Sequence, residues 1–106
     1  MSNDEYVIPS VLQNTIKRLA ARRGVKGILV CDEDGLPLQS NLPQSDAERV
    51  SAHVASLVKK VRSVSDAIDH GKLQSVYVEM PRSEIIITPD EAAGFTIVVL
   101  KERNAA

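Results

Sequence analysis

The sequence predicts an α/β fold of the α+β kind, in which a single five-stranded antiparallel sheet lies between helices in the order αββαβββ. Two stretches carry apolar residues at helical spacing, and five shorter ones have strand patterns. Short links between neighbouring strands are typical of antiparallel pairing. Strands that are apolar on both faces belong in the middle of a sheet, so the expected strand order is 2-1-5-4-3. Helices must then cover both faces.

Residues 8–23 are expected to form the first helix. Pro9 suits its first turn, where a missing N–H costs nothing, and Gly24 suits its C-terminal cap. One stripe of the helix is apolar and consists of Ile8, Val11, Leu12, Ile16, Leu19 and Ala20. Basic residues crowd the last turns, where they complement the helix dipole: Lys17, Arg18, Arg22 and Arg23.

The first two strands follow directly. VKGILVC, residues 25–31, is apolar on both alternating sets, which indicates a strand covered on both faces. GLPLQS, residues 35–40, is shorter and more polar. Because Pro37 cannot donate to a strand ladder, this second strand is expected at an edge.

The acidic run CDEDG between these strands is expected to be a hairpin turn. A calcium loop of the EF-hand type needs glycine at its sixth position and glutamate at its twelfth. Counting from Asp32, glycine comes fourth and Pro43 comes twelfth, so the calcium motif is absent. A catalytic carboxylate pair would need a cleft that separates the two pKa values, whereas these acids join two strands. An Asp-Gly pair between apolar runs is typical of a turn.

The second helix is expected to begin after Pro43, with Ser45 as its N-cap and Asp46 and Glu48 in its first turn. Asp69, His70 and Gly71 are expected to end it. Its apolar residues recur at alternating spacings of 3 and 4 and form a heptad seam: Ala47, Val50, Val54, Leu57, Val61, Val64 and Ile68. We expect this helix to serve two surfaces, the sheet beneath it and a partner beside it.

Three further strands complete the sheet. LQSVYVEM (73–80) alternates apolar and polar residues, whereas EIIIT (84–88) and FTIVVL (95–100) are apolar on both faces. The final residues, KERNAA, are expected to fray. Strand 73–80 is expected at an edge and has neither internal proline nor lysine to blunt it.

Length and composition restrict the classes of protein. The 106 residues form one expected domain, 1–106, with an ordered core at about 8–102. A net charge of −1 and 3% aromatic residues argue against nucleic-acid binding. No apolar run is long enough to cross a bilayer, so membrane insertion is not expected. MSNDEY does not resemble a signal peptide, and the single cysteine, Cys31, suits a cytoplasmic location.

Few residues suggest chemistry. There is no Gly-rich phosphate loop, and His53 and His70 have no metal-ligand spacing with Cys31. Catalytic, cofactor and metal sites are therefore not expected, and neither is enzyme activity. Two basic clusters are either solvated or receive an acidic partner: Lys17, Arg18, Arg22, Arg23 and Lys26 in one, and Lys59, Lys60 and Arg62 in the other.

An exposed strand edge beside an apolar helix seam predicts self-association. Two copies that pair strands 73–80 about a twofold axis would form one continuous ten-stranded sheet, with their second helices side by side. The alternative is that the chain's own ends cover the edge. The expected interface consists of Val50, Val54, Leu57, Val61, Val64, Ile68, Ser75, Val76, Tyr77 and Val78.

Three segments give the chain a family resemblance: VKGILVCDEDGLPLQSN, a long helix ending in VRSVSDAIDH, and EIIITPDEAAGFTIVVLKE. Together they resemble the roadblock family of dynein light chains over about residues 10–102. The most specific pieces are the Gly-Leu-Pro-Leu step at residues 35–38 and EIIITPD at 84–90. Thr88 stands where the family often has alanine.

The resemblance implies a roadblock/profilin-like sheet that dimerises through the second helix and third strand, and no enzyme activity or cofactor. The Gly-Leu-Pro-Leu step favours the dynein branch. The chain would then be a homodimeric adaptor, or a heterodimer with a roadblock paralogue, that binds a dynein intermediate-chain segment in the cargo-binding part of a microtubule motor. It would act in cytoplasmic, cytoskeleton-associated transport.

Other branches of the family offer an alternative function. They build scaffolds for small GTPases, such as the lysosomal Ragulator complex, or regulate Ras-like GTPases in bacteria and archaea. The Ala20-Ala21-Arg22-Arg23-Gly24 ending of the first helix departs from the dynein pattern. This departure leaves a GTPase-linked or prokaryotic role open.

Overall fold

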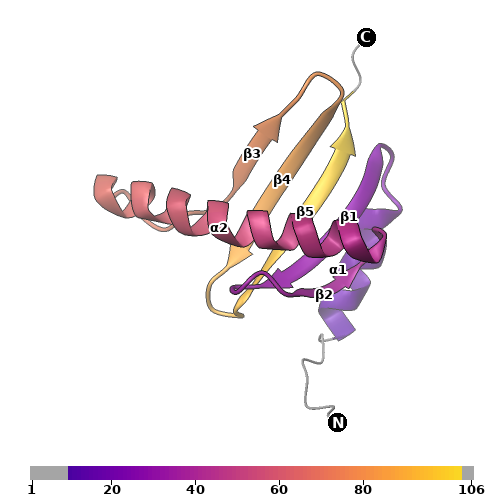
Figure 1. The fold of residues 1–106 in the computed structure, drawn as a ribbon, viewed down its shortest axis with the longest axis horizontal. Coiled ribbons are helices and arrows are strands. Elements are labelled where there is room, and N and C mark those ends of the chain that lie inside the picture. Colours follow the sequence, from indigo (N-terminus) through magenta and orange to yellow (C-terminus); the bar gives the residue numbers. More distant parts are fainter. Residues whose placement is uncertain (1–9, 104–106) are drawn as a thin grey trace.

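The computed structural model describes residues 10–103 and has the predicted element order (Figure 1). All neighbouring strands pair antiparallel in the order β2-β1-β5-β4-β3, which confirms the predicted topology. The elements are α1 (Ser10–Ala20), β1 (Val25–Asp32), β2 (Pro37–Ser40), α2 (Gln44–Ile68), β3 (Val76–Glu79), β4 (Ser83–Asp90) and β5 (Phe95–Glu102).

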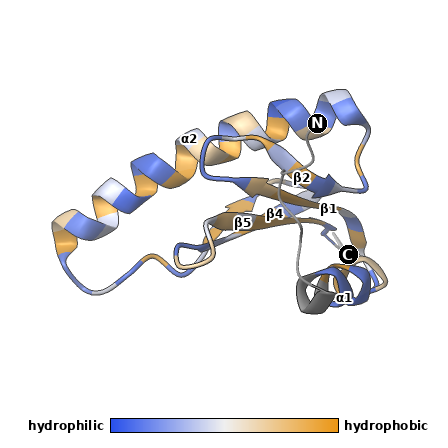
Figure 2. Cartoon of the chain, turned by 90° about the horizontal axis from the view of Figure 1, so that it is seen from below, coloured by the Kyte–Doolittle hydropathy of each residue, from blue (hydrophilic) through white to orange (hydrophobic). Residues whose placement is uncertain are grey.

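The two helices lie on opposite faces of the sheet (Figure 2). On the α2 face, a buried cluster joins the helix to three strands through residues such as Val54, Leu29 and Ile87. On the other face, Ile16 of α1 is buried with Ile28 and Val30 of β1. Each face therefore has its own core, because the central strands are apolar on both sides.

The first helix is shorter than the pattern predicted. It ends at Ala20, so Arg22 and Arg23 lie in the following turn and not in the last helical turn. Arg22 N–H still donates to Leu19 O at 3.1 Å, and Gly24 takes a φ of +84° just before β1. The predicted start at residues 8–9 lies outside the described residues.

The second helix begins at Gln44, so the predicted Ser45 N-cap is wrong. Pro43 occupies the cap position, with no side-chain cap hydrogen bond, and its carbonyl accepts the Ala47 N–H at 2.9 Å. The helical conformation thus starts immediately after the proline, and Ser45 is already inside the helix. At the other end, Asp69 adopts a left-handed φ of +61°, and its N–H bonds to Ser65 O.

Two strands differ in length from the predicted ones, the edge strand β3 and the central strand β5. β3 covers Val76–Glu79, so residues 73–75 lie outside the strand that was predicted at 73–80. β5 continues to Glu102, so the expected fraying from Lys101 onward is wrong for its first residues. Glu102 N–H donates to Gly24 O at 2.7 Å, and this backbone contact holds the strand end against the turn before β1.

Candidate functional site

The acidic loop is a hairpin turn, as predicted. The Asp32 carboxylate is buried at the end of β1, where its Oδ1 accepts the N–H groups of Asp34 and Leu36, each at 2.9 Å. Gly35 has a φ of +88° and donates its N–H to Asp32 O at 3.1 Å. The best-placed carboxylate of the run is therefore committed to the backbone of the turn.

Cys31 lies in the core as predicted for a small apolar residue. Burial raises the pKa of its thiol to about 11, the nearby Ser51 hydroxyl lowers it, and Asp32 raises it further. A thiol that stays protonated at neutral pH is a poor nucleophile. His53 and His70 are exposed, and within residues 10–103 no three His, Cys, Asp or Glu side chains gather to hold a metal ion.

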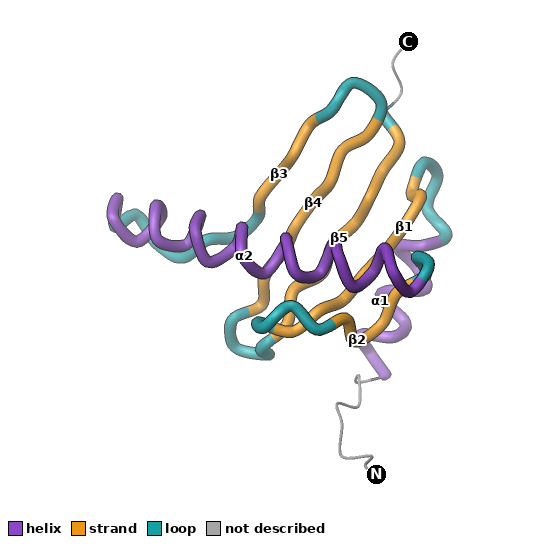
Figure 3. The backbone as a smooth tube through the Cα atoms, in the orientation of Figure 1, coloured by secondary structure: helices purple, strands orange, loops and turns teal. Residues whose placement is uncertain are grey.

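The two halves of α2 have different surroundings. The first half crosses the sheet and buries Ala47, Ser51, Val54 and Val58. The second half projects past β3, beyond the edge of the sheet (Figure 3). There the seam continues with Val64 at 57% exposure and Ile68 at 58%. This projecting end carries apolar side chains that its own chain leaves open to solvent.

The predicted interface residues on α2 therefore divide into two groups, with the half-buried Val61 between them. Val54 is only 6% exposed, and Val50 packs against the same core, so these two residues stabilise the monomer and offer little surface to a partner. Leu57, Val64 and Ile68 are exposed large apolar residues. A regular seam in the sequence cannot show where the sheet beneath the helix ends, which is why the pattern grouped them together.

The β3 edge pairs with β4 on one side only. Tyr77 is 61% exposed, whereas Val76 and Val78 are half-buried. Ser75, predicted on this edge, lies outside the strand. The edge is thus shorter than predicted, and none of the other described strands pairs with its outer side. In the view of Figure 3, the end of α2 extends past this edge.

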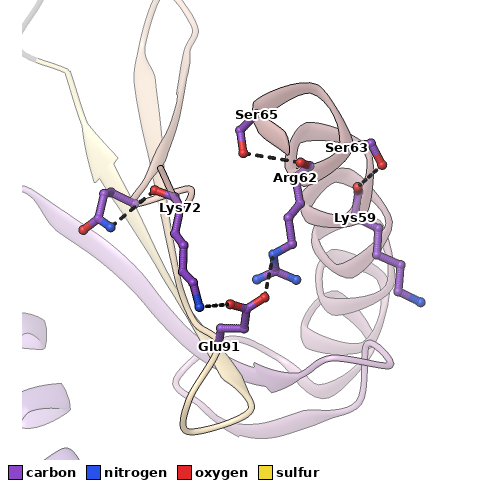
Figure 4. A network of polar contacts seen from close by, with 7 residues as sticks. Lys59, Arg62, Ser63, Ser65, Lys72 and Glu91 are labelled. Carbon is purple, nitrogen blue, oxygen red and sulfur yellow. Dashed lines mark hydrogen bonds and ion pairs between the residues drawn. The ribbon is translucent and has the colours of Figure 1, made fainter. Parts of the chain in front are cut away.

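A polar contact that was not predicted holds the projecting helix (Figure 4). Glu91, in the loop after β4, contacts Arg62 Nε of α2 at 3.6 Å and Lys72 Nζ, just beyond α2, at 3.2 Å. One carboxylate therefore connects three segments far apart in the sequence. Arg62 belongs to the second basic cluster, so at least one residue of that cluster forms an ion pair within the chain. Only the spatial proximity of these segments, which the pattern does not show, would have revealed this contact.

None of the helices within the described residues has both the length and the apolarity to cross a membrane.

Comparisons with known proteins agree with this geometry. The sequence model of the Roadblock/LC7 domain family matches residues 11–101 of this chain. A Roadblock/LC7 domain from Streptomyces avermitilis superposes with a TM-score of 0.76 at 22% identity, covering 83% of this chain and 75% of that one. Myxococcus xanthus MglB superposes with a TM-score of 0.74 at 15% sequence identity, covering 84% of this chain and 73% of that one. The gliding protein MglB from Thermus thermophilus superposes with a TM-score of 0.75 at 9% identity, covering 100% of this chain and 84% of that one.

Proposed function

The chain belongs to the Roadblock/LC7 domain family, and from this premise we propose that it is a cytoplasmic, dimeric, non-catalytic regulator or scaffold of a small Ras-like GTPase. The observation that carries the proposal is the open surface formed by the projecting end of α2 and the β3 edge. We name Leu57, Val64, Ile68 and Tyr77 the open seam; all four are large, apolar and exposed.

Pairing of two copies would cover the open seam. An unpaired strand edge attracts a second strand, and a twofold axis beside β3 would bring the projecting ends of both α2 helices onto the partner protomer. Burying four large apolar side chains on each copy contributes about 1.5–3 kcal/mol per fully buried side chain before the entropic cost of association. A homodimer is therefore supported, and a roadblock paralogue would present a comparable surface.

The paired α2 helices would offer a flat platform to a GTPase. Their outward residues include Arg49, His53 and Lys60, all exposed. A platform without a nucleophile or a metal cluster among the described residues regulates by holding its partner's mobile loops in one arrangement, and needs no catalytic group of its own.

The GTPase role is favoured over the dynein role by the origin of the similar structures. The similar structures described above come from bacteria. For bacterial members of the family, the sequence resemblance implies regulation of Ras-like GTPases. The dynein reading rests on the step at residues 35–38, whose Leu36 is 57% exposed at the tip of the β1–β2 turn and thus accessible to a partner.

The deciding experiment measures binding to the Ras-like GTPases encoded in the same genome. We expect one of them to bind the dimer with different affinity in its GDP form and its GTP-analogue form, by isothermal titration calorimetry. A dynein intermediate-chain segment, where the genome encodes one, is the competing ligand. Tight binding of that segment together with no binding of any GTPase in either form would overturn the proposal.

A further inference from the structure

Within residues 10–103, the sheet face opposite α2 is only partly covered. The helix α1 lies under β1 at one side of this face (Figure 2), where Ile16 is buried. The same face continues across β5, β4 and β3 through Val99, Ile86 and Tyr77, which are partners in the strand register. Three apolar residues in a row on a sheet face would normally lie beneath a covering layer.

A groove of about 490 Å³ runs along the boundary between α1 and these uncovered strands. Its floor contains Ile86, Ile97 and Val99, and its rim contains Arg22, Arg23 and Lys101. We name these six residues the cationic groove. An apolar floor with a charged rim is the anatomy of a protein-binding site.

The rim carries an excess of positive charge. Arg22, Arg23 and Lys101 form no ion pair with any residue between 10 and 103. Glu84 lies opposite Lys101 in the strand register, without an ion pair between them. Glu84 and Glu102 line a neighbouring pocket that also contains Arg23 and Lys101. Arg22 and Arg23, in the turn after α1, and Lys101 of β5 therefore remain available to an acidic ligand.

The dimensions of the uncovered face fit one helix. Adjacent strands are about 4.8 Å apart, so β5, β4 and β3 present a strip about 10 Å wide between the outer two. An α-helix with its side chains is about 10–12 Å in diameter. A single helix beside α1 would thus complete the layer on this face.

We propose that the cationic groove docks an amphipathic helix of a partner protein, whose apolar stripe packs on Ile86 and Val99 and whose flanking Asp or Glu residues meet Arg22, Arg23 and Lys101. Amphipathic helices bind such grooves through anchors at helical spacing. The groove lies on the sheet face opposite α2, so this inference does not rest on the GTPase proposal. Either can fail without the other.

The test uses a synthetic, fluorescently labelled 16-residue peptide with leucines on one helical stripe and glutamates beside it. A matched peptide has lysine in place of every glutamate. We expect the full-length protein to bind the glutamate peptide at least fivefold more tightly in fluorescence anisotropy. Equal affinity for the two peptides, or binding to neither, would overturn the proposal.

Charge reversal on the rim is the decisive variant. Arg22→Glu with Arg23→Glu changes two exposed side chains, so the fold is retained and the preference should switch to the lysine peptide. Lys59→Glu with Lys60→Glu, exposed on α2, is the matched control and should leave the original preference unchanged. An unchanged preference in the first variant, or a switched one in the control, would contradict the assignment.

Ile86→Arg places a charge in the floor and should abolish binding of the glutamate peptide while the circular dichroism spectrum is retained. If this variant instead converts a dimer into a monomer in sedimentation, the groove is occupied by a second copy and the proposal fails.

The chain's own first residues are the remaining candidate occupant of the groove. If Asp4→Lys with Glu5→Lys raises peptide affinity more than threefold, that segment is the occupant and the partner helix is excluded.

Discussion

Ser51 has an unusual environment for a serine. It is buried in the middle of α2, and among the described residues its Oγ forms no hydrogen bond within the usual distance and angle limits. The Cys31 thiol, whose pKa this hydroxyl lowers, is a weak hydrogen-bonding group. A buried hydroxyl without a partner costs about 1–3 kcal/mol, since water would have satisfied it in the unfolded chain. Ser51 lies under the β1–β2 turn, where its carbonyl oxygen is close to Gly35.

Ser51→Ala is therefore expected to raise the free energy of unfolding by about 1 kcal/mol beyond the gain from helix propensity. Ser56→Ala, at an exposed position of the same helix, is the matched control and reports the propensity gain alone. Urea denaturation of both variants measures the difference. A Ser51→Ala protein less stable than the Ser56→Ala protein would show that the buried hydroxyl is satisfied in solution.

Single residues were predictable where local chemistry decides them. The turn role of Asp32 and Gly35 follows from the residue types at adjacent positions, and the structure confirms it. Ser45 was predicted as an N-cap on the same local reasoning and was wrong, because the fixed φ of Pro43 starts the helix two residues earlier. The role of Glu91 depends on three distant segments, so local reasoning gave no sign of it.

At the scale of elements, the β1–β2 turn and α2 approach each other closely. A Cβ atom at Gly35 would lie 3.0 Å from Ala52 Cα and 3.2 Å from Ser51 O, both in the backbone of α2. Backbone atoms within a helix cannot move aside cheaply. The glycine thus satisfies two requirements, a positive φ and the space beneath the helix.

Gly35→Ala is expected to lower the free energy of unfolding by about 1–2 kcal/mol for the left-handed conformation, with about 1–3 kcal/mol more for crowding against α2. Gly94→Ala is the matched control, because Gly94 has a similar φ of +82° but open space around it. Thermal denaturation followed by circular dichroism compares the two. Equal losses of stability would mean that α2 yields and that the turn is not held beneath it.

Helix and strand identities were predictable, whereas their ends were not. The apolar periodicities placed all seven elements, and burial on both faces ordered the strands correctly. The last turns of α2 are exposed because the helix is longer than the sheet is wide. The width of the sheet results from the pairing of five strands, so the helix sequence alone does not predict it. The cationic groove was missed for a similar reason: Arg22 and Arg23 were seen as part of a basic cluster, but Lys101 and the floor of the groove come from two distant strands, β4 and β5.

At the scale of the whole molecule, the α2 residues of the open seam and the cationic groove involve different faces. Val64 and Ile68 project with α2 past the sheet, and Ile86 and Val99 lie on the face opposite that helix. Tyr77 of the open seam is the partner of Ile86 in the strand register and thus lies on the face of the groove. Self-association through α2 and partner binding in the groove would therefore not compete for the same residues. This separation lets a dimer present two copies of the groove.

Val64→Asp is expected to weaken the dimer without unfolding the protomer, because Val64 is already exposed within its own chain. Each buried charge is expected to weaken the dimer by at least about 1.4 kcal/mol, which is a tenfold increase in the dissociation constant. The twofold axis places this charge in the interface twice. Sedimentation velocity at micromolar concentration measures the dissociation. Ser63→Asp, at an exposed neighbouring position, is the control and should stay dimeric. A monomeric wild-type protein would contradict the dimer itself.

The position of β5 between β1 and β4 has a consequence for biosynthesis. Among the five described strands, the ribosome makes β5 last, yet both halves of the sheet depend on it for their hydrogen bonds. While β5 remains in the exit tunnel, β1–β2 and β3–β4 are two separate hairpins, and isolated hairpins are marginal in water. We therefore expect the nascent sheet to stay unfolded until β5 has emerged from the ribosome.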